Sequence, residues 1–158
     1  MKLKKWIPYI IGIGSAVAVG ALSGLLSMEG MERYSETVVK PALTPPDWLF
    51  PVVWTILYAL MGISAARIWL RPDSPQRTRG LNLYIAQLII NFFWSLIFFN
   101  AQAFGFAAIW LILLWVLVLL MIRAFSKVDK IAAYLQIPYL IWLTFALYLN
   151  IAVWLLNQ

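Results

Sequence analysis

Residues 40–50 read Lys-Pro-Ala-Leu-Thr-Pro-Pro-Asp-Trp-Leu-Phe and separate two long apolar segments. Proline cannot continue a helix from its N-terminal side, because it lacks an N–H donor and its ring clashes with the preceding turn. It also disfavours the α region for the residue before it. Pro41, Pro45 and Pro46 therefore predict a stiff, extended loop. A stiff loop between two apolar segments suggests a lid.

The rest of the chain has the composition of a membrane protein. Of its 158 residues, 64% are hydrophobic and 11% are charged, far from the usage of soluble domains. Charged residues are absent from 6–28, 48–66, 80–122 and 131–158. The third of these runs is about twice the length that one helix needs to cross roughly 30 Å of hydrocarbon, so it holds two helices with a hairpin near 100–105.

We therefore predict a single all-α integral membrane domain over 1–158, built as a bundle of five transmembrane helices in the lipid bilayer. The expected helices cover about 6–28, 47–70, 80–100, 103–123 and 130–156, and the lid loop covers about 29–46. Lys and Arg gather at the N-terminus and in the second and fourth loops, which is typical of the cytoplasmic side. We expect a plasma-membrane protein with its N-terminus in the cytoplasm and its C-terminus outside. The excess of basic residues behind the net charge of +6 therefore indicates how the helices are oriented in the membrane. No nucleic-acid partner is expected.

The N-terminal segment allows a second interpretation, a cleaved signal peptide with the small residues Ala-Val-Ala at 16–18. Against it, the apolar run continues ten residues past that site, and small residues recur at every fourth position: Gly12, Ala16, Gly20 and Gly24. Such a stripe lets helices approach closely. It predicts a helix interface, either inside the bundle or between protomers.

Missing residue types exclude much chemistry. The chain has no Cys and no His, which removes the usual metal ligands, thiol nucleophiles, axial haem ligands and the commonest general base. Its six carboxylates fall in predicted loops or at span ends, so we expect no buried one to serve an ion-coupled transporter. We expect no metal site and no required cofactor.

Aromatic and amide side chains gather in the outer half of the predicted bundle, under the lid. At about 1.5 Å of rise per residue, most of them lie roughly 9 to 21 Å below the outer surface. Residues four apart share one helix face, and unpaired amides facing lipid are costly, so the polar faces should point into the bundle. The candidate ligand-binding residues are Trp54, Tyr58, Gln87, Asn91, Trp94, Ser95, Trp142, Ala146 and Asn150.

Two other interpretations apply to parts of this set. Gln87, Asn91 and Asn150 are also suited to hydrogen bonds that join helices, without any ligand. Tryptophans near span ends suit an interfacial aromatic belt, but Trp54, Trp94 and Trp142 are too deep for it. A cavity lined by indoles and amides would suit a flat, hydrophobic ligand with one or two polar groups, such as a tetrapyrrole, a sterol or a planar drug.

Three motifs resemble those of the TspO/MBR family, the tryptophan-rich sensory proteins and translocator proteins. The first comprises Lys40-Pro41, Thr44-Pro45-Pro46, Trp48, Phe50-Pro51, Trp54, Leu57-Tyr58 and Met61-Gly62. The second comprises Gln87-Leu88, Asn91, Trp94-Ser95 and Phe98-Phe99. The third comprises Pro138-Tyr139, Trp142, Phe145-Ala146, Leu149-Asn150, Trp154 and Asn157.

The resemblance implies a five-helix bundle, usually a homodimer, that binds protoporphyrin IX and related porphyrins, and in animal members cholesterol and planar drugs. It implies a pocket framed by Trp54 and Asn91, with Trp142 and Ala146 beside them. Leu155 stands where an Arg usually follows the Trp of the sterol-linked segment, which argues against a sterol ligand. The lid residues that we single out are Pro41, Leu43, Thr44, Pro45, Pro46 and Trp48.

The lid departs from the family pattern at two places. Members often carry Trp-Tyr ahead of the Lys-Pro pair and Trp before Thr-Pro-Pro, where this chain has Tyr34-Ser35 and Leu43. With fewer aromatic rings on the lid, we expect ligand binding to be weaker or altered in specificity. Leu43→Trp should then change porphyrin affinity.

Three functions are compatible with this pattern. The first, which we predict, is a membrane receptor or sensor that binds porphyrins and needs only the pocket and the lid. The second is an enzyme promoting the light- and oxygen-dependent degradation of protoporphyrin IX, with Trp54 and Trp142 as candidate catalytic residues. The third is a transporter of porphyrin, lipid or sterol, although the lack of inverted repeats and of buried carboxylates disfavours ion coupling.

Overall fold

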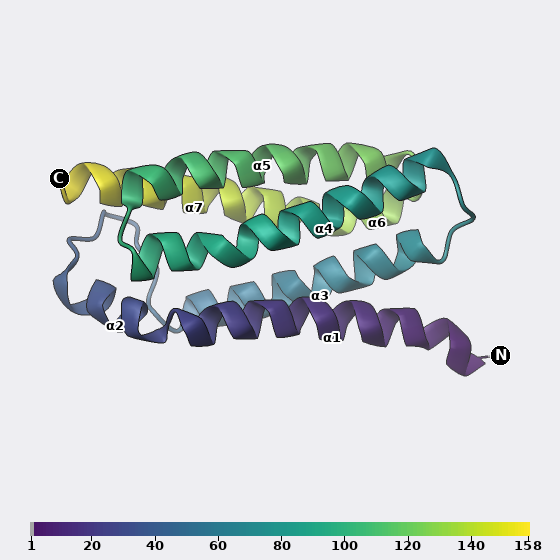
Figure 1. Ribbon diagram of the computed structural model, residues 1–158, viewed down its shortest axis with the longest axis horizontal. Helices are drawn as coiled ribbons and strands as arrows, with labels where there is room; N and C mark the ends of the chain where they lie inside the picture. Colours follow the sequence, from purple (N-terminus) through teal and green to yellow (C-terminus); the bar gives the residue numbers. More distant parts are fainter. Residues whose placement is uncertain (1) are drawn as a thin grey trace.

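The computed structural model describes residues 2–158, and these residues form helices and loops with no strand. Five helical segments are long and apolar enough to cross a membrane, and they run side by side along the long axis of the molecule (Figure 1). The prediction of an all-α, five-helix integral membrane protein is confirmed. The elements in chain order are α1 (Lys2–Leu26), α2 (Met28–Thr37), α3 (Leu49–Trp69), α4 (Pro75–Ser95), the π-helical turn η1 (Leu96–Asn100), α5 (Phe104–Ser126), α6 (Lys130–Leu135) and α7 (Ile137–Leu156).

The third and fifth spanning segments differ most from their predicted bounds. The third begins at Pro75 rather than near residue 80, because Ser74 caps it by accepting a hydrogen bond from the Arg77 N–H and proline fits the first turn of a helix. The fifth, predicted as one helix, is divided at Gln136 into α6 and α7. Pro138 follows this break, and it has no N–H to donate to the preceding turn.

The first loop is the largest difference from the prediction. Residues 29–46 were expected to form an irregular lid, but Met28–Thr37 is the amphipathic helix α2. Only the following segment, 38–48, is non-helical, and it contains the three prolines. The prolines stop a helix only at and just before their own positions, so the residues ahead of them are free to form one.

The stripe of small residues on α1 packs inside the bundle. Gly12 lies against the backbone of Gly62 on α3, Ala16 is fully buried, and Gly20 lies against the ring of Tyr58. A side chain at Gly12 would collide with the Gly62 carbonyl group. Gly24 has open space beside its Cα atom, so three of the four positions make the α1–α3 contact.

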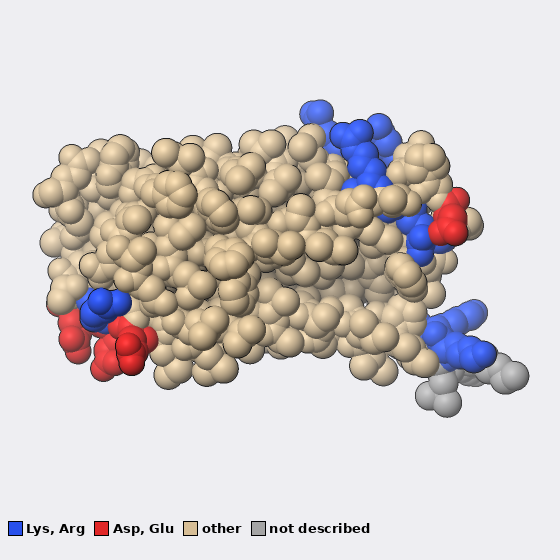
Figure 2. Space-filling view, viewed as in Figure 1, with Lys and Arg blue, Asp and Glu red and all other residues tan. Residues whose placement is uncertain are grey.

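Charge is divided between the two ends of the bundle (Figure 2). Lys and Arg gather at one end, where α3 meets α4 and α5 meets α6, and acidic residues gather at the other end, where α2 carries Glu29, Glu32 and Glu36. Between the ends, large apolar side chains cover the outside of the helices, as a lipid-facing surface requires.

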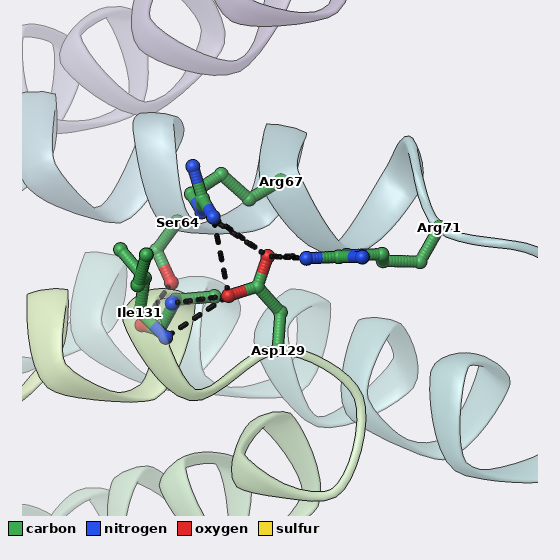
Figure 3. Close-up of polar contacts among 6 residues, drawn as sticks. Ser64, Arg67, Arg71, Asp129 and Ile131 are labelled. Carbon is green, nitrogen blue, oxygen red and sulfur yellow. Dashed lines mark hydrogen bonds and ion pairs between the residues drawn. The ribbon is translucent and has the colours of Figure 1, made fainter.

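The basic end contains a buried carboxylate, so the prediction that no carboxylate is buried is wrong. Asp129 is 6% exposed, and its carboxylate lies 3.1 Å from a guanidinium nitrogen of Arg67 and 3.1 Å from one of Arg71 (Figure 3). It also accepts hydrogen bonds from the N–H groups of Ile131 and Ala132, which caps α6. Asp129 thus ties α3 to the start of α6, and its charge is fully paired.

Candidate ligand-binding site

A cavity of about 580 Å³ lies inside the half of the bundle that carries α2. Its wall is made by residues of α1, α2, α3, α4, η1 and α7. Cavities of 300 to 1,000 Å³ are the usual size for small-molecule sites. The cavity is therefore the candidate functional site.

Two indoles form one corner of the cavity. The ring of Trp54 on α3 stands perpendicular to that of Trp142 on α7, with 6.5 Å between the ring centroids. Tyr58 lies one turn further along α3, 5.6 Å from Trp54, and Phe50 packs 5.9 Å from Trp142. Such a corner offers both ring faces and ring edges to a flat apolar molecule.

A second aromatic group comes from α4 and η1. Trp94 stacks on Phe98 with 5.0 Å between the centroids, and Phe99 packs edge-on against both rings. The hydrogen bond from the Ala101 N–H to the Leu96 carbonyl spans five residues and widens this turn. Phe98 and Phe99, which both lie in this turn, line the cavity. The sequence contains no signal for a π-helical turn, so η1 was not foreseen.

Hydrogen bonds link the base of the cavity to the core behind it. Tyr58 donates to Asn91 Oδ1 at 2.6 Å, and Asn91 Nδ2 donates to the Tyr139 hydroxyl at 2.6 Å. Tyr139 donates in turn to Gln87 Oε1 at 2.7 Å. Gln87 is fully buried and does not line the cavity, so it supports Tyr139 from behind.

Asn150 makes a similar bridge on another wall. It accepts a hydrogen bond from the Trp94 indole N–H at 3.0 Å and donates to the Phe104 carbonyl at 2.8 Å. All three candidate amides therefore join helices, as the alternative interpretation proposed, and Asn91 and Asn150 also line the cavity. The Trp142 indole N–H differs from them, because it is buried and has no hydrogen-bond partner.

Eight of the nine candidate ligand-binding residues line the cavity, and Gln87 is the exception. The first span and the first loop also contribute to the cavity, and the predicted set of residues does not include them. Ser23 and its small neighbours on α1 form one side of the cavity, and residues of α2 form another. The signal for α2 was available, because Glu29, Glu32 and Glu36 have the spacing of one helix face. The lining residues outside the candidate set are Val17, Gly20, Ala21, Ser23, Gly24, Met31, Glu32, Tyr34, Ser35, Asp47, Phe50, Pro51, Thr55, Phe98, Phe99 and Leu149.

The six candidate lid residues lie outside the lining of the cavity. Leu43 is 78% exposed and has a φ of 70°, a left-handed conformation that is uncommon for leucine. Trp48 is 65% exposed. The segment is instead fastened to α7, since Asn157 exchanges two hydrogen bonds with the backbone of Val39 and the Tyr148 hydroxyl donates to the Ala42 carbonyl.

The fold and the cavity define a class of protein: a five-helix integral membrane protein with an aromatic cavity inside one half of the bundle. The chain belongs to the TspO/MBR family, whose model matches residues 12–155. The family resemblance of the sequence motifs is thereby confirmed. This family includes membrane proteins named as sensors and as translocators.

Bacterial and animal relatives have similar levels of sequence identity to this chain. The chain is 37% identical to the tryptophan-rich protein TspO of Chlorobaculum tepidum, over 98% of each chain. It is 35% identical to the protein CrtK of Rhodobacter capsulatus, over 99% of this chain and 95% of the relative. It is 34% identical to the translocator protein of Homo sapiens, over 94% of this chain and 89% of the relative.

Proposed function

We propose that this protein is a membrane receptor or sensor that binds porphyrins, protoporphyrin IX among them, and other flat hydrophobic ligands in the cavity. The observation that carries the proposal is the corner formed by Trp54 and Trp142, whose perpendicular rings face a cavity of about 580 Å³. A macrocycle stacked on one indole would meet the edge of the other.

We further propose that the protein works as a homodimer in the plasma membrane, with its basic end in the cytoplasm.

A second candidate function is the light- and oxygen-dependent degradation of protoporphyrin IX. It is favoured by the same two indoles, which lie against the space that the ligand would occupy and within 6.5 Å of each other. In that case Trp54 and Trp142 are the catalytic residues.

Titration of the protein with protoporphyrin IX in lipid nanodiscs, in the dark and under light, tests both functions. For a receptor we expect quenching of indole fluorescence with unchanged porphyrin absorption bands. For the enzyme we expect the bands to disappear under light at a rate that falls in Trp54→Phe or Trp142→Phe.

A variant of the cavity and a control variant outside it test where the porphyrin binds. The double variant Trp54→Phe, Asn91→Ala should bind porphyrin at least roughly tenfold more weakly, because it removes an indole face and breaks the Tyr58–Asn91–Tyr139 chain. Trp6→Phe serves as the control, since Trp6 is 62% exposed on the N-terminal part of α1. Full porphyrin affinity in the double variant would refute the proposed site.

A further inference from the structure

The last residue of η1, Asn100, is bonded to both α1 and α2. Its side-chain Nδ2 donates a hydrogen bond to the carbonyl of Leu26, the last residue of α1, at 2.8 Å. The Arg33 guanidinium of α2 donates to the Asn100 backbone carbonyl at 3.2 Å. Carbonyl groups at the end of a helix lack the partners that they have within it, so a side chain that donates to one of them fixes the helix end. Asn100 thus holds the junction of α1 and α2 against η1.

Gly30 lets α2 approach η1 closely. It is buried, and a Cβ atom at this position would collide with the Phe99 backbone and with the Asn100 side chain. α2 packs mainly against η1, and Figure 1 shows it beside the end of α4, where η1 follows. Since the backbone of α2 meets the backbone of η1 here, no flexible side chain lies between them to take up a displacement.

The same contact positions one wall of the cavity. The ring centroid of Tyr34 on α2 lies 5.3 Å from that of Phe98 and 5.2 Å from that of Phe99, and all three side chains line the cavity. These three rings form the α2–η1 wall, whereas the corner of Trp54 and Trp142 is built from α3 and α7. The residue that holds α2 on η1 therefore determines where the α2–η1 wall lies relative to that corner.

We propose that Asn100 is a positioning residue of the cavity, which fixes the α2–η1 wall for contact with the far side of a large flat ligand and so favours large ring systems over small ones. This inference rests on the proposed function of the cavity. A small ring system finds its aromatic contacts in the corner of the two indoles, whereas a macrocycle also reaches the α2–η1 wall. A wall that is already fixed costs less conformational entropy when the ligand binds, so the gain goes to the ligand that touches it.

Protoporphyrin IX and pyrenemethanol test this role, because both are flat and they differ in the size of the ring system. Binding is measured by quenching of indole fluorescence in lipid nanodiscs. Asn100→Ala removes the bond to Leu26, and Gly30→Ala forces α2 away from η1 from the opposite side. Ser64→Ala is the matched structural control, since this buried hydroxyl donates to the Ala132 carbonyl at 2.7 Å between α3 and α6 and does not line the cavity.

In Asn100→Ala and in Gly30→Ala we expect the affinity for protoporphyrin IX to fall roughly tenfold, as for the loss of one or two aromatic contacts, and that for pyrenemethanol to change less than about threefold. Ser64→Ala should lower the unfolding temperature and leave both affinities unchanged. A merely structural role of Asn100 would change the two affinities by the same factor. Each affinity ratio between variants is taken for the same ligand, so partitioning of the ligand into lipid cancels.

Two outcomes would overturn the inference. One is an equal loss of affinity for both ligands in Asn100→Ala, which would mean that the residue only stabilises the fold. The other is an unchanged porphyrin affinity in both Asn100→Ala and Gly30→Ala, which would mean that the α2–η1 wall does not contact the ligand.

A measurement without ligand separates this inference from the proposed function. The chain has no Cys, so spin labels can be attached at Glu36→Cys on α2 and Ile109→Cys on α5, two exposed positions that do not line the cavity. Pulsed electron paramagnetic resonance should give a distribution of label distances that broadens in Asn100→Ala and stays narrow in Ser64→Ala. A distribution that stays narrow in Asn100→Ala overturns the inference. If it broadens but the wild-type protein binds no porphyrin, the porphyrin function is wrong, while the placement of the α2–η1 wall by Asn100 is supported.

Discussion

Gly12 of α1 and Gly62 of α3 touch backbone to backbone, with no side chain between the two helices. Close approach of this kind maximises packing and lets weak contacts form along the whole interface, which is how helices associate where lipid removes the hydrophobic driving force. The contact continues through the fully buried Ala16 to Gly20, which lies against the Tyr58 ring. Tyr58 in turn lines the cavity, so the α1–α3 distance sets the position of one cavity wall.

Gly62→Ala should separate α1 from α3. The new methyl group would overlap the Gly12 backbone, which cannot move aside as a flexible side chain can, and we expect a loss of about 1 to 3 kcal/mol in stability. Thermal unfolding in detergent measures the loss. Gly14→Ala is the control, because Gly14 has open space around it and should tolerate alanine. Equal unfolding temperatures for Gly62→Ala and Gly14→Ala would contradict the close contact.

Tyr139→Phe should destabilise the protein from within the core. The Tyr139 hydroxyl accepts from Asn91 Nδ2 and donates to Gln87 Oε1, so its removal leaves these two buried amide atoms without that partner, at a cost of about 1 to 3 kcal/mol. The unfolding temperature measures this cost. Tyr134→Phe removes a hydroxyl from a side chain that is 63% exposed, and it should change stability little.

Asp129→Asn should weaken the link between α3 and α6. Burial raises the pKa of the Asp129 carboxyl, but hydrogen bonds from the Ala132 N–H and Arg71 and the charge of Arg67 outweigh this effect, and the pKa lies below its ordinary value. At neutral pH we expect a loss of about 2 kcal/mol, since one partner of a buried pair is removed while the guanidinium of Arg71 keeps access to water.

The pH dependence of this loss follows from the direction of the pKa. A carboxyl whose pKa is lower in the folded state stabilises the protein above its unfolded-state pKa of about 3.9, and the stabilisation disappears as the pH falls through the folded-state pKa. The stability difference between wild type and Asp129→Asn should therefore shrink in acid. Asp73→Asn, at an exposed carboxylate paired with Arg77, is the control and should have little effect at any pH. A difference that stays constant from neutral to acid pH would argue against an ionised Asp129.

Asn157→Ala should loosen the segment 38–48. Its side chain accepts from the Val39 N–H and donates to the Val39 carbonyl, and these bonds hold the proline-containing segment against the end of α7. We expect faster amide hydrogen exchange in this segment and faster ligand association and dissociation. Asn82→Ala, on α4 at the other end of the bundle, is the control. Unchanged exchange at 38–48 would show that the prolines alone hold the segment in place.

Much of this architecture is readable from the order of residue types along the chain. The length of the uncharged runs predicts the spans, because a helix must cross a fixed thickness of hydrocarbon while satisfying its own backbone hydrogen bonds. Helical rise and periodicity place Trp54, Asn91 and Trp142 in the outer half of the bundle on inward faces. These are properties of single helices, so no knowledge of how the helices pack is needed to predict them.

Other features depend on how the helices meet. Whether an amide faces a cavity or a neighbouring side chain is a matter of a few ångströms between helices, and this is why Asn91 lines the cavity while Gln87, one turn away on the same face of α4, does not. Asp129 can likewise be buried only because Arg67 and Arg71 of α3 pair with it, since an unpaired carboxylate would be too costly to bury. Composition and periodicity thus predict the helices and their polar faces, while packing between helices distant in sequence determines which of those faces enclose a cavity.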